Sequence, residues 1–174
     1  MDPRLRRCVT RCILELSRGK FTDFCEEFDY IVVDLPSIIY GLNRPEAFIV
    51  NLGLAQQLGQ LRARFILVLD YSRDKHRLLA EKRLRVIREL GVEYILSSDK
   101  PAEIKAAETV SELRKRGYSA VVLSRDYDPL LIVDDMLQPV GAKFAWIVRH
   151  IKIDRECLSS KCKFDLNVSS MCQG

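Results

Sequence analysis

Acidic residues follow several apolar runs of this sequence, at the points where those runs end. The run "VVLS" leads into "RDYDP", which carries Asp126 and Asp128 with one residue between them. In extended backbone, residues i and i+2 project to the same side, so these two carboxylates can face one point in space. Other apolar runs end at Asp34 and Asp70, and another is followed by Glu103 in "SSDKPAEIK".

If these five carboxylates met, they would form a site with a specific chemistry. Ionised carboxylates a few ångströms apart repel one another, and each raises the pKa of its neighbours. A hard divalent cation reverses that balance, because Mg²⁺ takes oxygen ligands and neutralises the charge. Two such ions about 3.5 to 4 Å apart can activate a water and stabilise the leaving oxygen of a phosphodiester. The pattern therefore indicates an acidic site that binds a divalent metal ion.

Each acid also has a local structural explanation, which stays open at this point. Asp34 could cap a turn, and Asp70 could begin an Asx-turn in "DYSRDK". Asp128 could cap a helix that has Pro129 at its first position. Glu103 lies in the first turn of a predicted helix, where the dipole favours a carboxylate. Taken together, these roles do not explain why the acids recur at three strand ends and one helix start.

Strands and helices alternate along the chain, and this order decides whether the acids can meet. Apolar, β-branched runs predict strands, whereas periodic apolar positions with Pro or Gly at their ends predict helices. The predicted strands are residues 29–35, 65–70, 92–97, 119–124 and 143–150. The predicted helices are residues 4–17, 45–62, 75–90, 101–116 and a short one over 128–137.

This alternation is typical of an α/β fold with a mainly parallel sheet and helices on both faces. We expect three layers around a five-stranded sheet. The carboxyl ends of parallel strands share one edge, where ligands bind, so the acids would meet there. We expect residues 29–154 to form this domain, residues 1–28 an N-terminal helical extension packed on it, and residues 155–174 a cysteine-containing tail.

Composition and charge favour a soluble globular protein with a polyanionic partner. Of the 174 residues, 48% are hydrophobic and 30% are charged, which is not the composition of a disordered chain. No apolar run approaches the roughly 20 residues of a membrane span, so we expect no membrane and a cytoplasmic location. The net charge of +4 is concentrated over residues 73–88. That stretch is either a solvated helix face or a surface that contacts phosphates.

The six cysteines do not have the spacing of a zinc site, because the chain has no CxxC motif. Cys8 and Cys12 are four residues apart and would share one helix face, while Cys157, Cys162 and Cys172 lie in the tail at the other end of the chain. A cytosolic protein normally keeps its cysteines reduced, with intracellular proteins of hyperthermophiles as the exception. A second interpretation is therefore that the tail cysteines pin the C-terminal segment to the N-terminal helix.

Four segments, in the same order, resemble the PIN nuclease superfamily. "SRDYDPLL" resembles the "S-x-D-x-D-x-L" segment of flap endonucleases, and NYN-type PIN domains share a similar element. "KPAEIKAAE" is similar to the "P-S-E-G-E-A-x-A-A" segment that precedes it there. "VVDLPSIIY" resembles the opening "D-x-x-N-x-x-Y", and "FILVLD" resembles the strand ending "V-F-D-G". The resemblance covers about residues 30–150.

The resemblance implies a PIN-like fold and a nuclease that depends on Mg²⁺ or Mn²⁺. Carried over position by position, it assigns the catalytic carboxylates to Asp34, Asp70, Glu103, Asp126 and Asp128, with all but Asp70 named as metal ligands. Ser37 would help to orient the first aspartate. The residues expected to contact nucleic acid are Ser37, Arg73, Lys75, His76, Arg77, Lys105 and Arg125.

The sequence also departs from the flap endonucleases in three ways. Lys105 stands where they have a second glutamate, and Tyr71 replaces the glycine after the second-strand aspartate. The chain ends soon after the fifth predicted strand, which leaves no room for their long helical DNA-binding region. A minimal PIN or NYN domain acting on single-stranded RNA or DNA, with RNA favoured, is therefore the better description. A homodimer or a protein partner is a further expectation.

Two other classes of function remain as alternatives. The first is a PIN-like module of weak or no activity that binds nucleic acid or protein in a complex, as the lysine at 105 would allow. The second is a small-molecule α/β domain. Against the second, "DLPSIIYGL" is neither GxGxxG nor a P-loop, and His76 and His150 are the only histidines.

Overall fold

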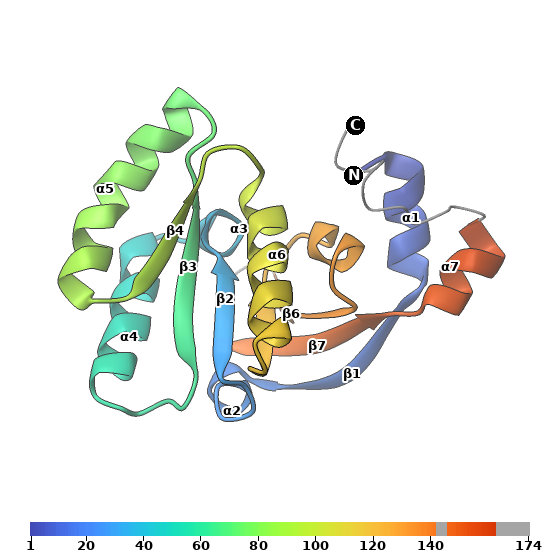
Figure 1. Cartoon of the computed structure of the whole chain (residues 1–174), viewed down its shortest axis with the longest axis horizontal. Helices are drawn as coiled ribbons and strands as arrows, with labels where there is room; N and C mark the ends of the chain where they lie inside the picture. Colours follow the sequence, from blue (N-terminus) through green and yellow to red (C-terminus); the bar gives the residue numbers. More distant parts are fainter. Residues whose placement is uncertain (142–145, 163–174) are drawn as a thin grey trace.

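A seven-stranded sheet with helices on both faces forms the body of the molecule (Figure 1). The computed structural model describes residues 1–141 and 146–162. The strand order is β1-β7-β6-β5-β2-β3-β4. The strands from β6 to β4 pair in parallel, whereas β7 is antiparallel to both β6 and β1. No helix among the described residues is long and apolar enough to cross a membrane.

The elements follow one another in the alternating order that the sequence predicts. The strands are β1 Ile13–Lys20, β2 Tyr30–Asp34, β3 Arg64–Asp70, β4 Glu93–Ser97, β5 Ala120–Leu123, β6 Asp135–Pro139 and β7 Ile147–Ile153. The α-helices are α1 Pro3–Arg11, α2 Phe21–Phe24, α3 Leu35–Ile39, α4 Pro45–Gln57, α5 Asp74–Leu90, α6 Ala102–Lys115 and α7 Arg155–Cys162, and a 3₁₀ turn, η1, spans Asp128–Leu131. As predicted, α5 ends at Gly91, whose φ of 68° is a left-handed conformation that suits glycine.

Successive residues of the central strands bury on opposite faces, and this alternation divides the core in two. Ile31 and Val33 of β2 pack with α3, α4 and α5, while Val32 packs with α6 and the two terminal helices. Both faces of the sheet are therefore covered, and the carboxyl ends of the parallel strands remain as the open edge. This arrangement places the ends of β2, β3 and β5 side by side.

The N-terminal region differs from the prediction of one helix over residues 4–17. The helix ends at Arg11, and residues 13–20 form β1, the edge strand that pairs with β7. The open edge of β7 offers backbone donors and acceptors that need partners, and this tertiary pairing outweighs a weak local helix propensity. The ladder shifts register between Glu15 and Ser17, which bends the strand around the sheet.

The region after the acid pair also differs, and this changes the strand count from five to seven. The predicted helix over 128–137 is only the turn η1, and residues 135–139 form β6 between β5 and β7. Parallel pairing with β5 and antiparallel pairing with β7 satisfy its backbone, which a short helix could not do. Of the predicted strand 143–150, residues 147–150 belong to β7, and residues 143–145 lie outside the described residues.

Two disulfides join the first and last described helices. Cys8 bonds to Cys162 and Cys12 bonds to Cys157, so α1 is fastened to α7 at two points one helical turn apart. This confirms the interpretation that cysteines near the C-terminus pin that segment to the N-terminal helix. Cys172 lies outside the described residues. Cys25 is free and buried, and its burial raises the pKa of the thiol to about 12, so it is unreactive.

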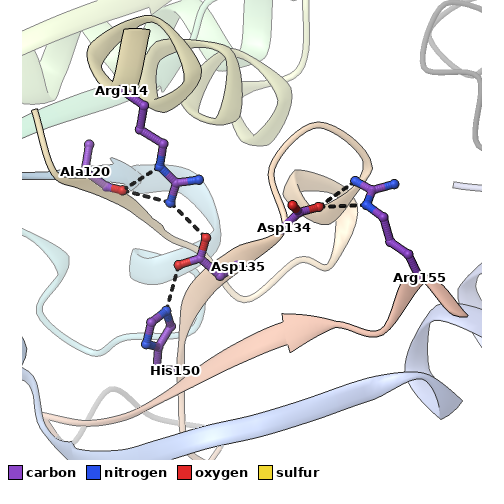
Figure 2. Close-up of polar contacts among 6 residues, drawn as sticks. All are labelled: Arg114, Ala120, Asp134, Asp135, His150 and Arg155. Carbon is purple, nitrogen blue, oxygen red and sulfur yellow. Dashed lines mark hydrogen bonds and ion pairs between the residues drawn. The ribbon is translucent and has the colours of Figure 1, made fainter. Parts of the chain in front are cut away.

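A polar cluster at the opposite edge of the sheet fixes the crossover into β6 and β7 (Figure 2). Arg114 of α6 donates to the carbonyl oxygen of Ala120 and, over 2.9 Å, to Asp135 Oδ1. The second oxygen of Asp135 lies 2.7 Å from His150 Nε2 on β7. Despite the raising effect of burial, the hydrogen bond from His150 and the charge of Arg114 hold the pKa of Asp135 below its ordinary value. One carboxylate thus ties a helix to two strands.

We expect Asp135→Ala to lower the free energy of unfolding by about 2 kcal/mol, because it leaves Arg114 and His150 without their shared acceptor. Asp134→Ala is the matched control. Asp134 is 57% exposed and, among the described residues, its side chain pairs with Arg155 alone, so its removal is expected to cost less than about 1 kcal/mol. Urea denaturation of the two variants at pH 7 measures the difference. Equal destabilisation would contradict a special role for the Asp135 cluster.

Candidate metal centre

Three carboxylates from separate segments meet at the carboxyl edge of the sheet. Glu103 lies in the first turn of α6, Asp126 lies in the turn after β5, and Asp128 opens η1. One oxygen of each lies within 4.8 Å of one oxygen of each of the others. The backbone N–H of Asp128 donates to Asp126 Oδ1 over 3.0 Å, which holds the acid pair in a tight turn. Asp126 and Asp128 therefore approach Glu103 together.

Asp34 lies behind this group, at the end of β2, and is 1% exposed. Its Oδ2 accepts a 2.6 Å hydrogen bond from Ser124 Oγ, and the backbone N–H of Asp126 donates to the same hydroxyl over 3.0 Å. Ser124 thus connects the first aspartate to the acid pair. The serine stands in the "S-x-D-x-D" motif of the sequence, but its role as a connector becomes visible only when β2 and β5 are seen as neighbours.

Ser37 takes part in the same network from α3. Its hydroxyl donates to the backbone carbonyl oxygen of Asp34 over 3.1 Å and lies 3.2 Å from Ser124 Oγ. The backbone N–H of Arg125 donates to Ser37 Oγ over 3.1 Å. Ser37 therefore braces the loop after β5 against the end of β2.

Burial and mutual repulsion raise the pKa of several acids in this region. The pKa of Asp34 is raised to about 6, first by burial and then by the charge of Asp126, against the lowering effect of the serine hydrogen bonds. The pKa of Glu103 is raised to about 7, first by burial and then by the neighbouring aspartates. Burial and Asp126 also raise the pKa of Asp128, while the Met1 amino group and Arg6 oppose that rise. The fold therefore holds these carboxylates together against an electrostatic penalty.

The oxygen atoms present fit a hard divalent cation. Asp128 Oδ1 is a buried atom with no hydrogen-bond partner among the described residues. A buried, unsatisfied carboxylate oxygen is costly, and a cation is a natural partner for it. Three carboxylates and no sulfur or imidazole in the group match the preference of Mg²⁺ and Mn²⁺ for oxygen ligands.

Asp70 has different surroundings and is not part of the group of three. At the end of β3, its Oδ1 accepts hydrogen bonds from the backbone N–H of Ser72 over 3.0 Å and from Ser72 Oγ over 2.6 Å. Its Oδ2 lies 2.9 Å from His76 Nδ1. The hydrogen bond from the Ser72 backbone forms the Asx-turn that "DYSRDK" allowed. A small pocket of about 70 Å³ lies beside it, lined by Asp70, His76, Arg83 and apolar side chains of α3 and α5.

The predicted phosphate-contacting residues lie at the start of α5, on α6 and after β5. Arg73 occupies the N-cap position of α5 without a capping hydrogen bond from its side chain, and Lys75 lies in the first turn. Arg77 donates to the Tyr71 carbonyl oxygen over 3.0 Å and stacks over the Tyr71 ring. Lys105 is half-buried, two residues beyond Glu103 on α6. Arg73, Lys75 and Lys105 form no ion pair among the described residues, so their charges are free for an external anion.

Arg125 is placed differently from the other basic residues. Its Nη1 donates to the Gly141 carbonyl oxygen over 2.7 Å, and burial lowers the pKa of the guanidinium. Its Nε and Nη2 atoms are buried without a hydrogen-bond partner in the described part of the chain. The guanidinium therefore keeps unsatisfied donors at the acidic edge, one residue before Asp126.

Comparison with solved structures identifies the fold. A crystal structure of the Holliday junction-resolving enzyme GEN1 in complex with product DNA and a Mg²⁺ ion matches with a TM-score of 0.59 and 14% sequence identity. The match covers 86% of this chain and 40% of the GEN1 chain. At this level of identity the similarity shows the fold alone. The PIN-like α/β fold implied by the sequence resemblance is therefore confirmed.

Two further structures match over a smaller part of the chain. The T5 D15 protein crystallised with metal ions has a TM-score of 0.40 at 12% identity, over 63% of this chain and 53% of its own. A variant of the T5 5'-exonuclease has a TM-score of 0.41 at 16% identity, over 64% of this chain and 49% of its own. No protein-family profile and no curated protein sequence matches the chain.

The raised pKa of Glu103 predicts how stability changes with pH. Between about pH 4.3, the ordinary glutamate value, and pH 7, the folded metal-free protein holds a proton that the unfolded chain has lost. The free energy of unfolding contributed by this group therefore falls as pH rises through that window. Mn²⁺ should relieve the repulsion, so the rise in Tm that it causes is expected to be larger at pH 8 than at pH 5. Thermal melts in EDTA and in Mn²⁺ test this, and an equal rise at both pH values would contradict it.

Proposed function

We propose that this chain with a PIN-like fold is a metal-dependent nuclease that hydrolyses phosphodiester bonds. The observation that carries the proposal is the convergence of Glu103, Asp126 and Asp128 within 4.8 Å of one another. Asp34 lies behind them and is joined to Asp126 through Ser124. A fold gains nothing from such an assembly of repelling carboxylates without a cation.

The chain's own residues would divide the work as follows. Glu103, Asp126 and Asp128 would hold Mg²⁺ or Mn²⁺, which when bound lowers the pKa of a water and stabilises charge on the phosphate. Asp34 would add negative charge and keep Asp126 in place through Ser124. The buried Asp128 Oδ1 atom has no hydrogen-bond partner in the described structure, and it would coordinate the ion.

The positive residues would hold the nucleic-acid backbone rather than read bases. Arg73, Lys75 and Arg77 lie at the start of α5, directly after the strand that ends at Asp70. Contacts of Arg and Lys with phosphates fix the register of a substrate without giving sequence specificity. We propose single-stranded RNA as the preferred substrate, with single-stranded DNA as the alternative that the assay below separates.

The assay compares cleavage of four end-labelled substrates of one sequence: single-stranded RNA, single-stranded DNA and the two duplexes. Each is incubated with purified protein in Mg²⁺, Mn²⁺ or EDTA. We expect cleavage in either metal, none in EDTA, and the fastest reaction with single-stranded RNA. Faster cleavage of DNA would refute the preference alone, and no cleavage of any substrate in either metal would refute the nuclease.

A second candidate is a PIN-like module that binds nucleic acid without cutting it. Two observations favour it: Lys105 carries a positive charge where flap endonucleases have a glutamate, and Asp70 is engaged by Ser72 and His76. The lysine lowers the negative charge available for a second ion, and the contacts of Asp70 occupy oxygen atoms that such an ion would need. Titration of Mn²⁺ by calorimetry beside the cleavage assay distinguishes the two, because only this candidate predicts ion binding without turnover.

A further inference from the structure

The helix α1 carries four arginines that no part of the proposed site uses. Arg4, Arg6, Arg7 and Arg11 are all exposed, and none forms an ion pair with an acid in residues 1–141 or 146–162. Leu5 and Val9 are the buried residues of this helix. Some exposed arginines elsewhere, such as Arg18 and Arg62, have acidic partners, whereas Arg73 at the start of α5 has none among the described residues. A short helix with this much unneutralised charge repels itself unless an anion binds.

The start of α1 lies at the metal centre. The Met1 amino nitrogen is 3.6 Å from Asp128 Oδ2, and Arg6 is close enough to act on the Asp128 carboxylate. Figure 1 shows α1 on the opposite side of the β2 strand end from α5. The acidic edge is thus flanked by two basic helices that are far apart in the sequence.

The two disulfides hold α1 in this position. Cys8 and Cys12 fasten it to Cys162 and Cys157 of α7, and α7 follows directly after β7 of the sheet. Only Leu5, Val9 and Cys12 of the first twelve residues are buried in the core. A helix with so small an apolar face depends on the cross-links to keep its place.

We propose that α1 is a second binding surface for the nucleic-acid backbone. A single-stranded nucleic acid that contacts α5 would cross the metal centre and then reach α1, and the disulfides keep this surface in place. This inference rests on the proposed function, because that function sets the path of the nucleic acid across the metal centre. The binding itself is the interaction of arginine with phosphate. Arg4 and Arg7, three residues apart, share one face of the helix. Arg6, on another face, is the arginine of this helix whose charge acts on the Asp128 carboxylate.

The test measures binding of fluorescein-labelled single-stranded RNA and single-stranded DNA by anisotropy, in EDTA so that nothing is cut, at several NaCl concentrations. The variant Arg4→Ala/Arg7→Ala is compared with the matched control Lys115→Ala/Arg116→Ala, which removes the same charge from exposed positions at the far end of α6. We expect the α1 variant to weaken binding at least about tenfold at low salt. The slope of log K against log[NaCl] should fall by about 1.4, which is two phosphate contacts on a single strand.

The disulfides are tested with the same probe. Replacing all four bonded cysteines by serine, or reducing the wild type with dithiothreitol, should shift the slope in the same direction as the arginine variant. Adding the arginine substitutions to the four-serine protein should then have little further effect. A salt slope that stays unchanged after reduction would overturn the role of the disulfides.

The two proposals fail separately. If wild type cuts nucleic acid in Mn²⁺ but the α1 variant and its control have the same salt slope, this inference is overturned and the nuclease stands. If no substrate is cut, but the α1 variant alone shows a smaller slope of log K against log[NaCl], the nuclease is overturned and the binding surface stands. If the α1 variant loses binding to anionic lipid vesicles while its nucleic-acid binding is unchanged, the nucleic-acid surface on α1 is also overturned.

Discussion

Asp126→Asn is expected to lower the rate of phosphodiester cleavage by about 10³-fold. Charge stabilisation by a bound metal contributes several kcal/mol to such reactions, and each 1.36 kcal/mol is a factor of about ten in rate. Asp126 is the central member of the acidic group, because Asp34, Glu103 and Asp128 all feel its charge. The substitution keeps the size of the side chain, so the hydrogen bond with the backbone of Asp128 can remain. Single-turnover cleavage in Mn²⁺ measures the effect.

Asp70→Asn is the informative companion to this variant. Asp70 is held by Ser72 and His76 outside the group of three, so we expect its substitution to reduce the rate by about tenfold or less. The thermal stability of both proteins without metal shows that each remains folded, and Asp126→Asn should stabilise the metal-free fold because it removes repulsion. A loss at Asp70 as large as that at Asp126 would instead support a catalytic centre with two ions.

Removing both disulfides is expected to lower the free energy of unfolding by about three times the effect of removing one. The two bonds have sequence separations of 154 and 145, so either one closes nearly the whole chain into a loop. In the chain-entropy model, the first bond closes a loop of this size and stabilises the fold by about 5 kcal/mol. Once it is formed, the second bond closes only a ring of roughly ten residues and adds about 2.7 kcal/mol. The loss of the last cross-link should therefore be the costly step.

The experiment compares Cys8→Ser/Cys162→Ser, Cys12→Ser/Cys157→Ser and the four-serine protein by denaturation in guanidinium. Each double variant should lose the smaller amount, and the four-serine protein more than the sum of the two. The variant Cys25→Ser serves as a control for the loss of a thiol that forms no bond, although its burial makes it sensitive to a polar replacement. Simple additivity would show that α1 is held mainly by packing through Leu5 and Val9.

The alternating pattern of apolar runs was sufficient to predict most of the central fold. β2, β3 and β5 are buried on both faces, so their sequences are nearly continuous apolar runs that end in recognisable turns. The edge strand β4 is half-buried but has the same apolar character. The prediction was wrong where a strand lies in an unusual environment. β1 is exposed along most of its length and follows directly after a helix, and β6 ends at a proline, so neither shows the apolar pattern of a typical strand.

The sequence by itself determined which acidic residues are present. Its alternating order of strands and helices also predicted a parallel sheet in which these acids lie at one edge. Only the tertiary structure decided which of them meet. Glu103 joins Asp126 and Asp128 because α6 begins over the turn that follows β5, while Asp70 is captured by its own turn. It also decided that α1, more than a hundred residues away in sequence, lies beside Asp128. Local patterns record what each segment prefers, but distances between side chains from distant segments depend on the pairing and packing of the whole chain.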